Sequence, residues 1–97
     1  MKTSELTGTA LNSAVMSCEG LSKRLFGDIN YSGDWNYGGP IIERERIELE
    51  HDGFEWWARI KADEDFSGST PLIAAMRCYV AASWGDEVPE EITKGKP

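Results

Sequence analysis

Two runs of alternating apolar and polar residues, separated by a short turn, constrain this chain most strongly. In the first run, Ile41 to Glu50, Ile47 and Leu49 alternate with charged residues. In the second, the apolar positions are Phe54, Trp56, Ala58 and Ile60. A period of two places alternate side chains on one face of a strand, and His51-Asp52-Gly53 is a turn sequence. The pattern therefore predicts a β-hairpin with one apolar face that another element must cover.

The polar face of this hairpin carries opposite charges on its two strands. Glu48 or Glu50 in the first strand is expected to pair across the hairpin with Arg59 or Lys61 in the second. Trp57 also falls on this polar face, where the alternation gives it no role.

Two helices flank the hairpin in the sequence. Near the N-terminus, Thr7 is the expected N-cap, Gly20 is the expected stop, and the apolar stripe repeats at helical spacing through Leu11, Ala14, Val15 and Cys18. The second helix has the strongest end signals, with Thr70 as N-cap, Pro71 in the first turn and Gly85 at the end. Its stripe consists of Leu72, Met76, Tyr79 and Val80.

The remaining segments are rich in turn residues. Residues 21–39 are expected to form a long connection in which Trp35 and Tyr37 either fold back onto the core or stand exposed as a binding surface. A third strand is expected from residues 29–37 or from the C-terminal tail. Residues 86–97 are expected to be a partly mobile tail.

The predicted order is helix, long loop, hairpin, helix, within a single domain over residues 1–97. The simplest way to bury the apolar faces is an α+β fold with two helices packed on a small antiparallel β-sheet. The two cysteines, Cys18 and Cys78, fall inside the predicted helices without metal-binding or redox spacing, and we interpret them as core side chains.

The charge of the chain is strongly uneven. The net charge is −7, and residues 28–91 contain fifteen acidic against five basic residues. Such a surface repels nucleic acid and attracts basic partners, so we expect no direct DNA or RNA binding. No apolar run approaches the length of a membrane span and no signal peptide opens the chain, which favours a cytosolic protein without membrane contact.

Two segments resemble the start of a calcium-binding loop. Residues 28–34 and 63–68 place Asp, Asn or Ser oxygens at alternate positions before a glycine. Such a loop needs a bidentate Glu at its twelfth position, where this chain has Gly39 and Ala74. We therefore predict no metal and no cofactor, and interpret both segments as turns that bond their own backbone.

Known catalytic motifs are absent from the sequence. His51 is the single histidine and falls in the predicted turn, and neither cysteine has an evident histidine partner. We therefore predict a protein that is not an enzyme. On residues alone, the chain is typical of a small acidic binding domain.

The acidic residues of the first strand suggest a geometry for binding. Residues two apart in a strand are separated by about 6.6–6.8 Å, close to the spacing of successive phosphates in a nucleic acid. Glu48, Glu50 and Asp52 have this spacing on one face, and Glu43 and Glu45 fall on the other. Such a row can occupy a basic groove that is built for a duplex.

Several blocks of the chain resemble a known family. They are residues 2–8 (KTSELTG), Tyr31-Ser32 with Asp34-Trp35, residues 38–44 (GGPIIER) and residues 70–80 (TPLIAAMRCYV). These blocks are similar to the NinX-like proteins of tailed phages, whereas Ser13 and residues 20–30 and 51–69 depart from the family pattern. The resemblance implies a phage protein that acts in the cytosol of a bacterial host. By size, charge and setting it is also similar in kind to anti-CRISPR inhibitors that mimic DNA.

Our hypothesis is a non-enzymatic inhibitor that blocks the duplex-binding groove of a host defence complex, most concretely a CRISPR surveillance complex, by acidic DNA mimicry. The residues expected to bind this basic partner are Asp34, Trp35, Tyr37, Glu43, Glu45, Glu48, Glu50, Asp52, Asp63, Glu64 and Asp65. The alternative is a phage accessory module whose GGPIIER segment pairs or oligomerises, with its acidity serving solubility alone.

Overall fold

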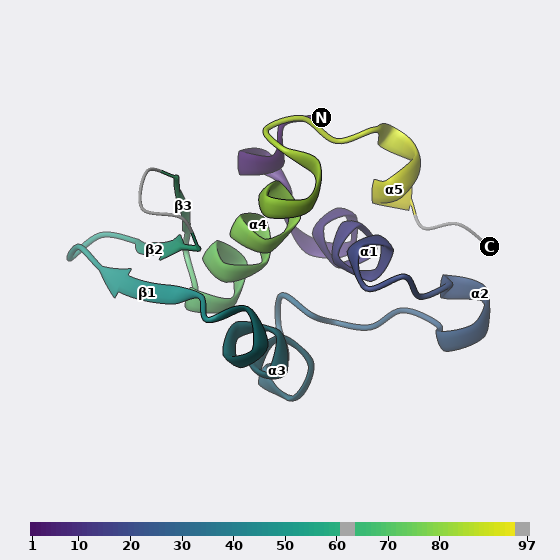
Figure 1. Cartoon of the computed structure of the whole chain (residues 1–97), viewed down its shortest axis with the longest axis horizontal. Helices are drawn as coiled ribbons and strands as arrows, with labels where there is room; N and C mark the ends of the chain where they lie inside the picture. Colours follow the sequence, from purple (N-terminus) through teal and green to yellow (C-terminus); the bar gives the residue numbers. More distant parts are fainter. Residues whose placement is uncertain (61–63, 95–97) are drawn as a thin grey trace.

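In the computed structural model, which describes residues 1–60 and 64–94, one long helix separates a small sheet from the other helices (Figure 1). The elements in chain order are η1 (Thr3–Glu5), α1 (Gly8–Cys18), α2 (Lys23–Phe26), α3 (Trp35–Glu45), β1 (Glu48–His51), β2 (Trp56–Arg59), β3 (Asp65–Gly68), α4 (Pro71–Trp84) and α5 (Glu90–Lys94). This arrangement confirms the α+β class and the order helix, hairpin, helix.

The central helix α4 begins and ends at the residues that the sequence indicates. The Thr70 hydroxyl accepts a hydrogen bond of 3.1 Å from the Ile73 amide, which satisfies one of the free amides of the first turn. Pro71 is the first helical residue, where its missing N–H removes no bond. Gly85 follows the last residue with a φ of 87°, a conformation that glycine adopts without steric cost.

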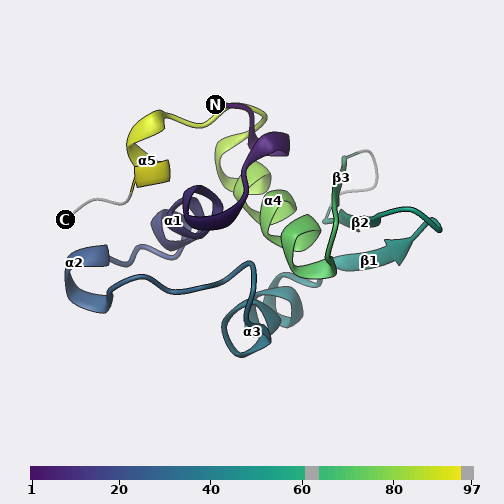
Figure 2. The same cartoon turned by 180° about the vertical axis from the view of Figure 1, so that it is seen from behind.

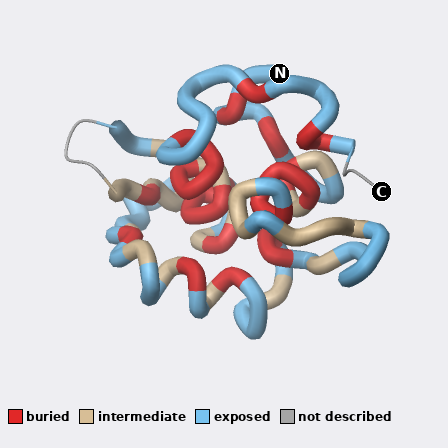
Figure 3. The backbone as a smooth tube through the Cα atoms, turned by 45° about the vertical axis from the view of Figure 1, so that its right-hand side comes forward, coloured by how far each residue is buried: buried red, intermediate tan, exposed pale blue. Residues whose placement is uncertain are grey.

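Helix α4 is buried around most of its circumference, so it forms the core of the molecule (Figure 3). It packs on β2 and β3 on one side and on α1 and α3 on the other. Small residues such as Ala74 and Ala75, both fully buried, allow these neighbours to approach closely. The prediction that both helices pack on the sheet is wrong for α1, which packs mainly on α4 and α5.

The two ends of the chain lie side by side. Lys2 and Glu87 form an antiparallel bridge, and the buried Thr3 hydroxyl donates a 2.7 Å hydrogen bond to the Gly85 carbonyl. Figure 2 shows α5 next to α1, where Ile92 is 5% exposed. Residues 86–94 therefore pack on the body of the protein rather than lying free of it. The mobility expected of the tail stays a prediction, and residues 95–97 lie outside the described residues.

The prediction of a strand over Ile41–Glu50 is wrong for its first half. Residues 35–45 form α3, which includes Pro40, and the strand begins only at Glu48. The Asp34 carboxylate accepts a hydrogen bond of 2.9 Å from the Asn36 amide and caps the helix. The expected long connection over residues 21–39 is correspondingly shorter, because it contains α2 and the start of α3.

Helix α3 ends at a residue whose type gives no stop signal. Arg46 takes a left-handed conformation with a φ of 53°, and the Ile47 amide bonds back to the Ile42 carbonyl at 3.0 Å. This closure is common at helix ends and usually uses glycine. Because the helix ends at Arg46 and β1 begins at Glu48, the strand is shorter than predicted.

The predicted hairpin is confirmed, and its third strand comes from an unexpected segment. In the antiparallel register, Glu48 lies opposite Arg59 and Glu50 opposite Trp57. Strand β3 pairs with β2; the prediction of a third strand from residues 29–37 or from the tail is wrong, because β3 is Asp65–Gly68. None of the described helices is long and apolar enough to cross a membrane.

Candidate interaction surface

The sheet has one face against α4 and one face toward solvent. The ladder places Leu49, Ala58 and Phe66 on the inner face, where Ala58 is buried. The outward side chains are Glu48, Glu50, Trp57, Arg59, Asp65 and Ser67. We call these six residues the outer sheet face. It contains a shallow depression of about 200 Å³ that is lined by Glu48, Glu50, Trp57, Arg59 and Asp65 together with the backbone beneath them.

Arg59, the cation of the outer sheet face, is paired with Asp65 of the same face. The Arg59 guanidinium donates two hydrogen bonds, of 2.6 and 3.0 Å, to the two oxygens of Asp65. These bonds raise the pKa of Arg59 and lower the pKa of the Asp65 carboxyl. The cross-strand ion pair predicted between Arg59 and Glu48 or Glu50 is therefore replaced by one with Asp65, and Lys61 lies outside the described residues.

The exposed carboxylates of Glu48 and Glu50 form no ion pair with a described residue. They stand two residues apart on β1, so their Cα atoms are about 6.6–6.8 Å apart. The register places Glu48 beside an arginine that is already neutralised and Glu50 beside an indole. Glu48 and Glu50 therefore give the outer sheet face a net negative charge that no described cation cancels.

Asp52, one of the predicted binding residues, has a structural role in the hairpin turn. One of its oxygens accepts hydrogen bonds of 2.8 and 2.9 Å from the amides of Phe54 and Glu55, and the other accepts 2.7 Å from the Trp57 indole. These bonds, that from Glu55 foremost, lower the pKa of Asp52 to about 2. The position of Trp57, which the alternation left unexplained, follows from this contact.

Phe54 occupies the tip of the hairpin and is 95% exposed. The sequence placed it on the inner face of the second strand, but β2 begins only at Trp56, because Asp52 holds residues 52–55 in the turn. The Asp52 carboxylate fixes the backbone of Phe54, and no described residue covers its side chain. Because this segment is already ordered, a partner that binds Phe54 would pay little entropy to order the backbone.

The predicted binding residues of α3 are not brought to the outer sheet face. Trp35 and Tyr37 are 53% and 47% exposed, and the Tyr37 ring meets the buried Tyr31 edge-on at 6.3 Å. Glu43 is exposed on the helix, and Glu45 accepts a 2.8 Å hydrogen bond from Arg44. Because Glu43 and Glu45 lie on a helix, they do not form the opposite face of the predicted carboxylate strand.

The acidic run before β3 is only partly described. Asp63 lies outside the described residues, Glu64 is exposed, and Asp65 is paired with Arg59. Of the predicted set, the structure therefore places Glu48, Glu50 and Asp65 on the outer sheet face, with Asp52 at its end. Asp34 serves as the cap of α3.

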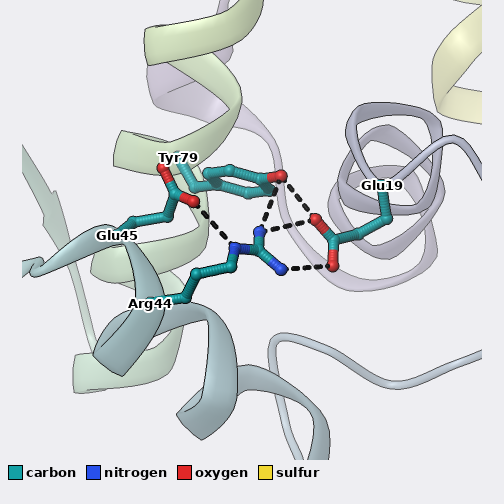
Figure 4. A network of polar contacts seen from close by, with 4 residues as sticks. All are labelled: Glu19, Arg44, Glu45 and Tyr79. Atoms are coloured by element: carbon teal, nitrogen blue, oxygen red, sulfur yellow. Dashed lines mark hydrogen bonds and ion pairs between the residues drawn. The ribbon is translucent and has the colours of Figure 1, made fainter.

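A polar network that no sequence pattern predicts joins three helical segments (Figure 4). The Arg44 guanidinium donates hydrogen bonds of 3.1 and 2.7 Å to the two oxygens of Glu19, at the end of α1. It also donates to the hydroxyl of Tyr79, which itself donates to Glu19. Glu45 accepts from the same guanidinium.

This network holds α1, α3 and α4 together, and each of its four side chains bonds to another member. The hydrogen bonds from Arg44 lower the pKa of Glu19, and burial, with the bond to Glu19, raises the pKa of Tyr79. Both groups are therefore held in the forms that bond to each other at neutral pH. No sequence spacing predicts this network, since its partners come from separate elements.

Gly38 marks a second close junction of α3 with α4. A Cβ atom at this position would lie 2.5 Å from a Leu72 methyl and 2.5 Å from the Tyr31 carbonyl oxygen, so only glycine fits. The GGPIIER and TPLIAAMRCYV blocks thus meet twice, at Gly38 with Leu72 and at Arg44 with Tyr79. Both segments are explained by packing within one chain.

The thiols are buried or half-buried in the structure. Both cysteines are free, and burial raises the pKa of Cys78 to about 11, in line with their interpretation as core side chains. Within residues 1–60 and 64–94, no three His, Cys, Asp or Glu side chains gather as metal ligands.

A protein-family model matches most of the chain. The family described as Bacteriophage P22, NinX matches residues 2–83. No curated protein matches the chain. The matched range runs from the segment before η1 to the last turn of α4 and includes the network, the hairpin and the whole sheet. The chain therefore belongs to the NinX family of phage proteins.

Proposed function

We propose that this phage protein is a non-enzymatic binding protein that acts in the cytosol of the bacterial host. Its partner is a basic, duplex-binding groove of a host defence complex, most concretely a CRISPR surveillance complex. The observation that carries the proposal is the pair Glu48 and Glu50, two exposed carboxylates at phosphate-like spacing on an open sheet face without a described counter-ion.

The geometry narrows the set of residues that act in this way. Arginines pair with Glu45 and Asp65, and hydrogen bonds within the chain fix Asp34 and Asp52. We therefore assign the role of phosphate to Glu48 and Glu50, the two acids of the outer sheet face that have no described partner. Trp57 lies opposite Glu50 on this face, and Phe54 is exposed at the tip of the same hairpin, so both supply apolar contact area. Aromatic side chains are enriched among the residues that contribute most to binding at protein interfaces.

The proposal predicts an association that depends on salt. Replacing phosphates in a basic groove releases counter-ions, so the affinity for the purified complex should fall steeply as salt rises. The double substitution Glu48→Lys and Glu50→Lys should abolish binding. A matched control, Glu5→Lys with Glu91→Lys, makes the same change of charge at exposed sites on other elements and should retain most of the affinity. An affinity that is insensitive to salt would contradict the proposal.

The alternative, a module that oligomerises, has one observation in its favour. Trp35 and Tyr37 are about half exposed on α3, and exposed aromatic side chains are enriched in protein interfaces. Sedimentation of the native protein and of a Trp35→Ser variant tests it. A native oligomer that dissociates in the variant would favour this candidate, and a monomer at all concentrations would remove it.

A further inference from the structure

The outer edge of β1 is the most open backbone surface of the described sheet. In the order β1-β2-β3, strand β1 has one neighbour, β2. No described residue bonds to its other side, and three of its four residues are exposed. In an antiparallel ladder, every second residue of an edge strand directs its N–H and C=O away from its neighbour. The edge therefore presents unpaired backbone groups.

The opposite edge of the sheet differs in this respect. On β3, the Ser67 carbonyl accepts a 2.7 Å hydrogen bond from the guanidinium of Arg77, which also bonds to the Leu6 carbonyl at 2.7 Å. A side chain from α4 therefore occupies part of the β3 edge. No described side chain bonds to the outer edge of β1 in this way, so a fourth strand would join the sheet there.

The charges beside the open edge select what can pair with it. A second copy of β1 would bring its own Glu48 and Glu50 to the same face, and like charges on neighbouring strands are destabilising. A strand with Lys or Arg at alternate positions would instead place its cations beside these two carboxylates. Apolar residues between the cations would lie beside Leu49, which is half-buried on the inner face.

We propose that β1 is a docking edge for an extended basic segment of a partner protein, which adds to the sheet as a fourth strand with its Lys or Arg side chains against Glu48 and Glu50. This inference rests on the proposed function, because it assumes that the partner is basic, and it adds how that partner is recognised. Backbone pairing supplies affinity in such strand addition, and side chains at alternate positions supply specificity.

Two synthetic peptides of identical composition test this proposal. One alternates arginine and valine; the other has all its arginines at one end, so it has the same charge without the alternation. We expect the alternating peptide to bind roughly tenfold more tightly, since only it can place a cation beside each carboxylate. Amide exchange should slow along residues 48–51 and remain unchanged on β3.

The charge-reversed variant with Glu48→Lys and Glu50→Lys should no longer bind the alternating arginine peptide. It should instead bind a peptide that alternates glutamate and valine. Gain of the acidic peptide shows that the variant is folded. The control variant with Glu5→Lys and Glu91→Lys should behave as the native protein does. Equal affinity for the two arginine peptides, binding of neither, or protection away from β1 would overturn the proposal.

The peptide assay contains no host complex, so its failure is distinguishable from failure of the proposed function. A protein that binds the alternating peptide but not the surveillance complex would overturn the proposed target and retain the docking edge. A protein that binds the complex with steep salt dependence, but does not distinguish the two peptides, would retain the target and overturn the docking edge.

Discussion

The guanidinium of Arg44 holds the carboxylate of Glu19 through two hydrogen bonds of 2.7 and 3.1 Å, although α3 and α1 are separated by a long stretch of chain. Tyr79 of α4 bonds to both groups. The helices α1, α3 and α4 are thereby joined at one point. The sheet that carries the candidate surface packs on α4 as well.

Replacing Arg44 with Lys should lower the free energy of unfolding, because a lysine cannot make the paired bonds to Glu19. We expect a cost of about 1 kcal/mol, since the bonds are charge-assisted but half exposed. Chemical denaturation measures the change. The exposed Arg24, substituted with Lys in the same way, serves as the control and should show almost none.

The same contact predicts a dependence of stability on pH. The folded pKa of Glu19 lies below its ordinary value of 4.5, so the stability that it contributes is present above pH 4.5 and is lost as the pH falls through the folded pKa. The native protein should therefore lose its advantage over a Glu19→Gln variant as the pH falls below 4.5. Parallel melting curves with a constant gap down to strongly acidic pH would count against this assignment.

Asp52 should report on the hairpin turn through Trp57. Its folded pKa of about 2 lies below the ordinary value of 3.8, so its bonds to the turn and to the indole persist above pH 3.8 and are lost as the pH falls through about 2. The tryptophan emission that disappears in an Asp52→Ala variant should titrate with a midpoint near 2. A midpoint at the ordinary value would show that the turn contact is absent in solution.

The two adjacent glycines of α3 should respond differently to alanine. Gly38→Ala places a methyl group 2.5 Å from Leu72 and from the Tyr31 carbonyl, and such overpacking costs about 1–3 kcal/mol. Gly39→Ala meets its nearest atom, in Trp35, at 3.7 Å, so the better helix propensity of alanine should leave stability equal or raise it by about 0.5–1 kcal/mol. Thermal melts of the two variants make the comparison, and equal melting temperatures would contradict the junction.

The parts of the fold that could be predicted are those with local signals. Thr70, Pro71 and Gly85 mark the ends of α4 by capping chemistry, and the alternation around the His51–Gly53 turn marks the hairpin. Helix α3 has a capping residue in Asp34, but Gly38, Gly39 and Pro40 inside it are typical of a turn, and they conceal a helix that packs on α4. Strand β3 has only four residues with Phe66 alone among them as a large apolar side chain, too short for a periodic pattern.

The candidate surface was predictable only in part for the same reason. Alternation within one strand indicates that Glu48 and Glu50 share an exposed face, as the structure shows. It does not reveal that Asp65 of β3 pairs with Arg59 on the neighbouring strand β2, or that Asp52 binds the turn and Trp57. Those roles depend on the strand register and on the geometry of the turn. Neither follows from a fixed spacing of residues in the sequence.

The most direct measurement is displacement of duplex DNA from a purified CRISPR surveillance complex by the native protein. We expect added protein to release the bound duplex in competition, with more protein needed as salt rises. Glu48→Lys with Glu50→Lys should remove the effect, while Glu5→Lys with Glu91→Lys should not. Duplex that stays bound at saturating protein, or displacement equally strong with the Glu48 and Glu50 reversals, would contradict it.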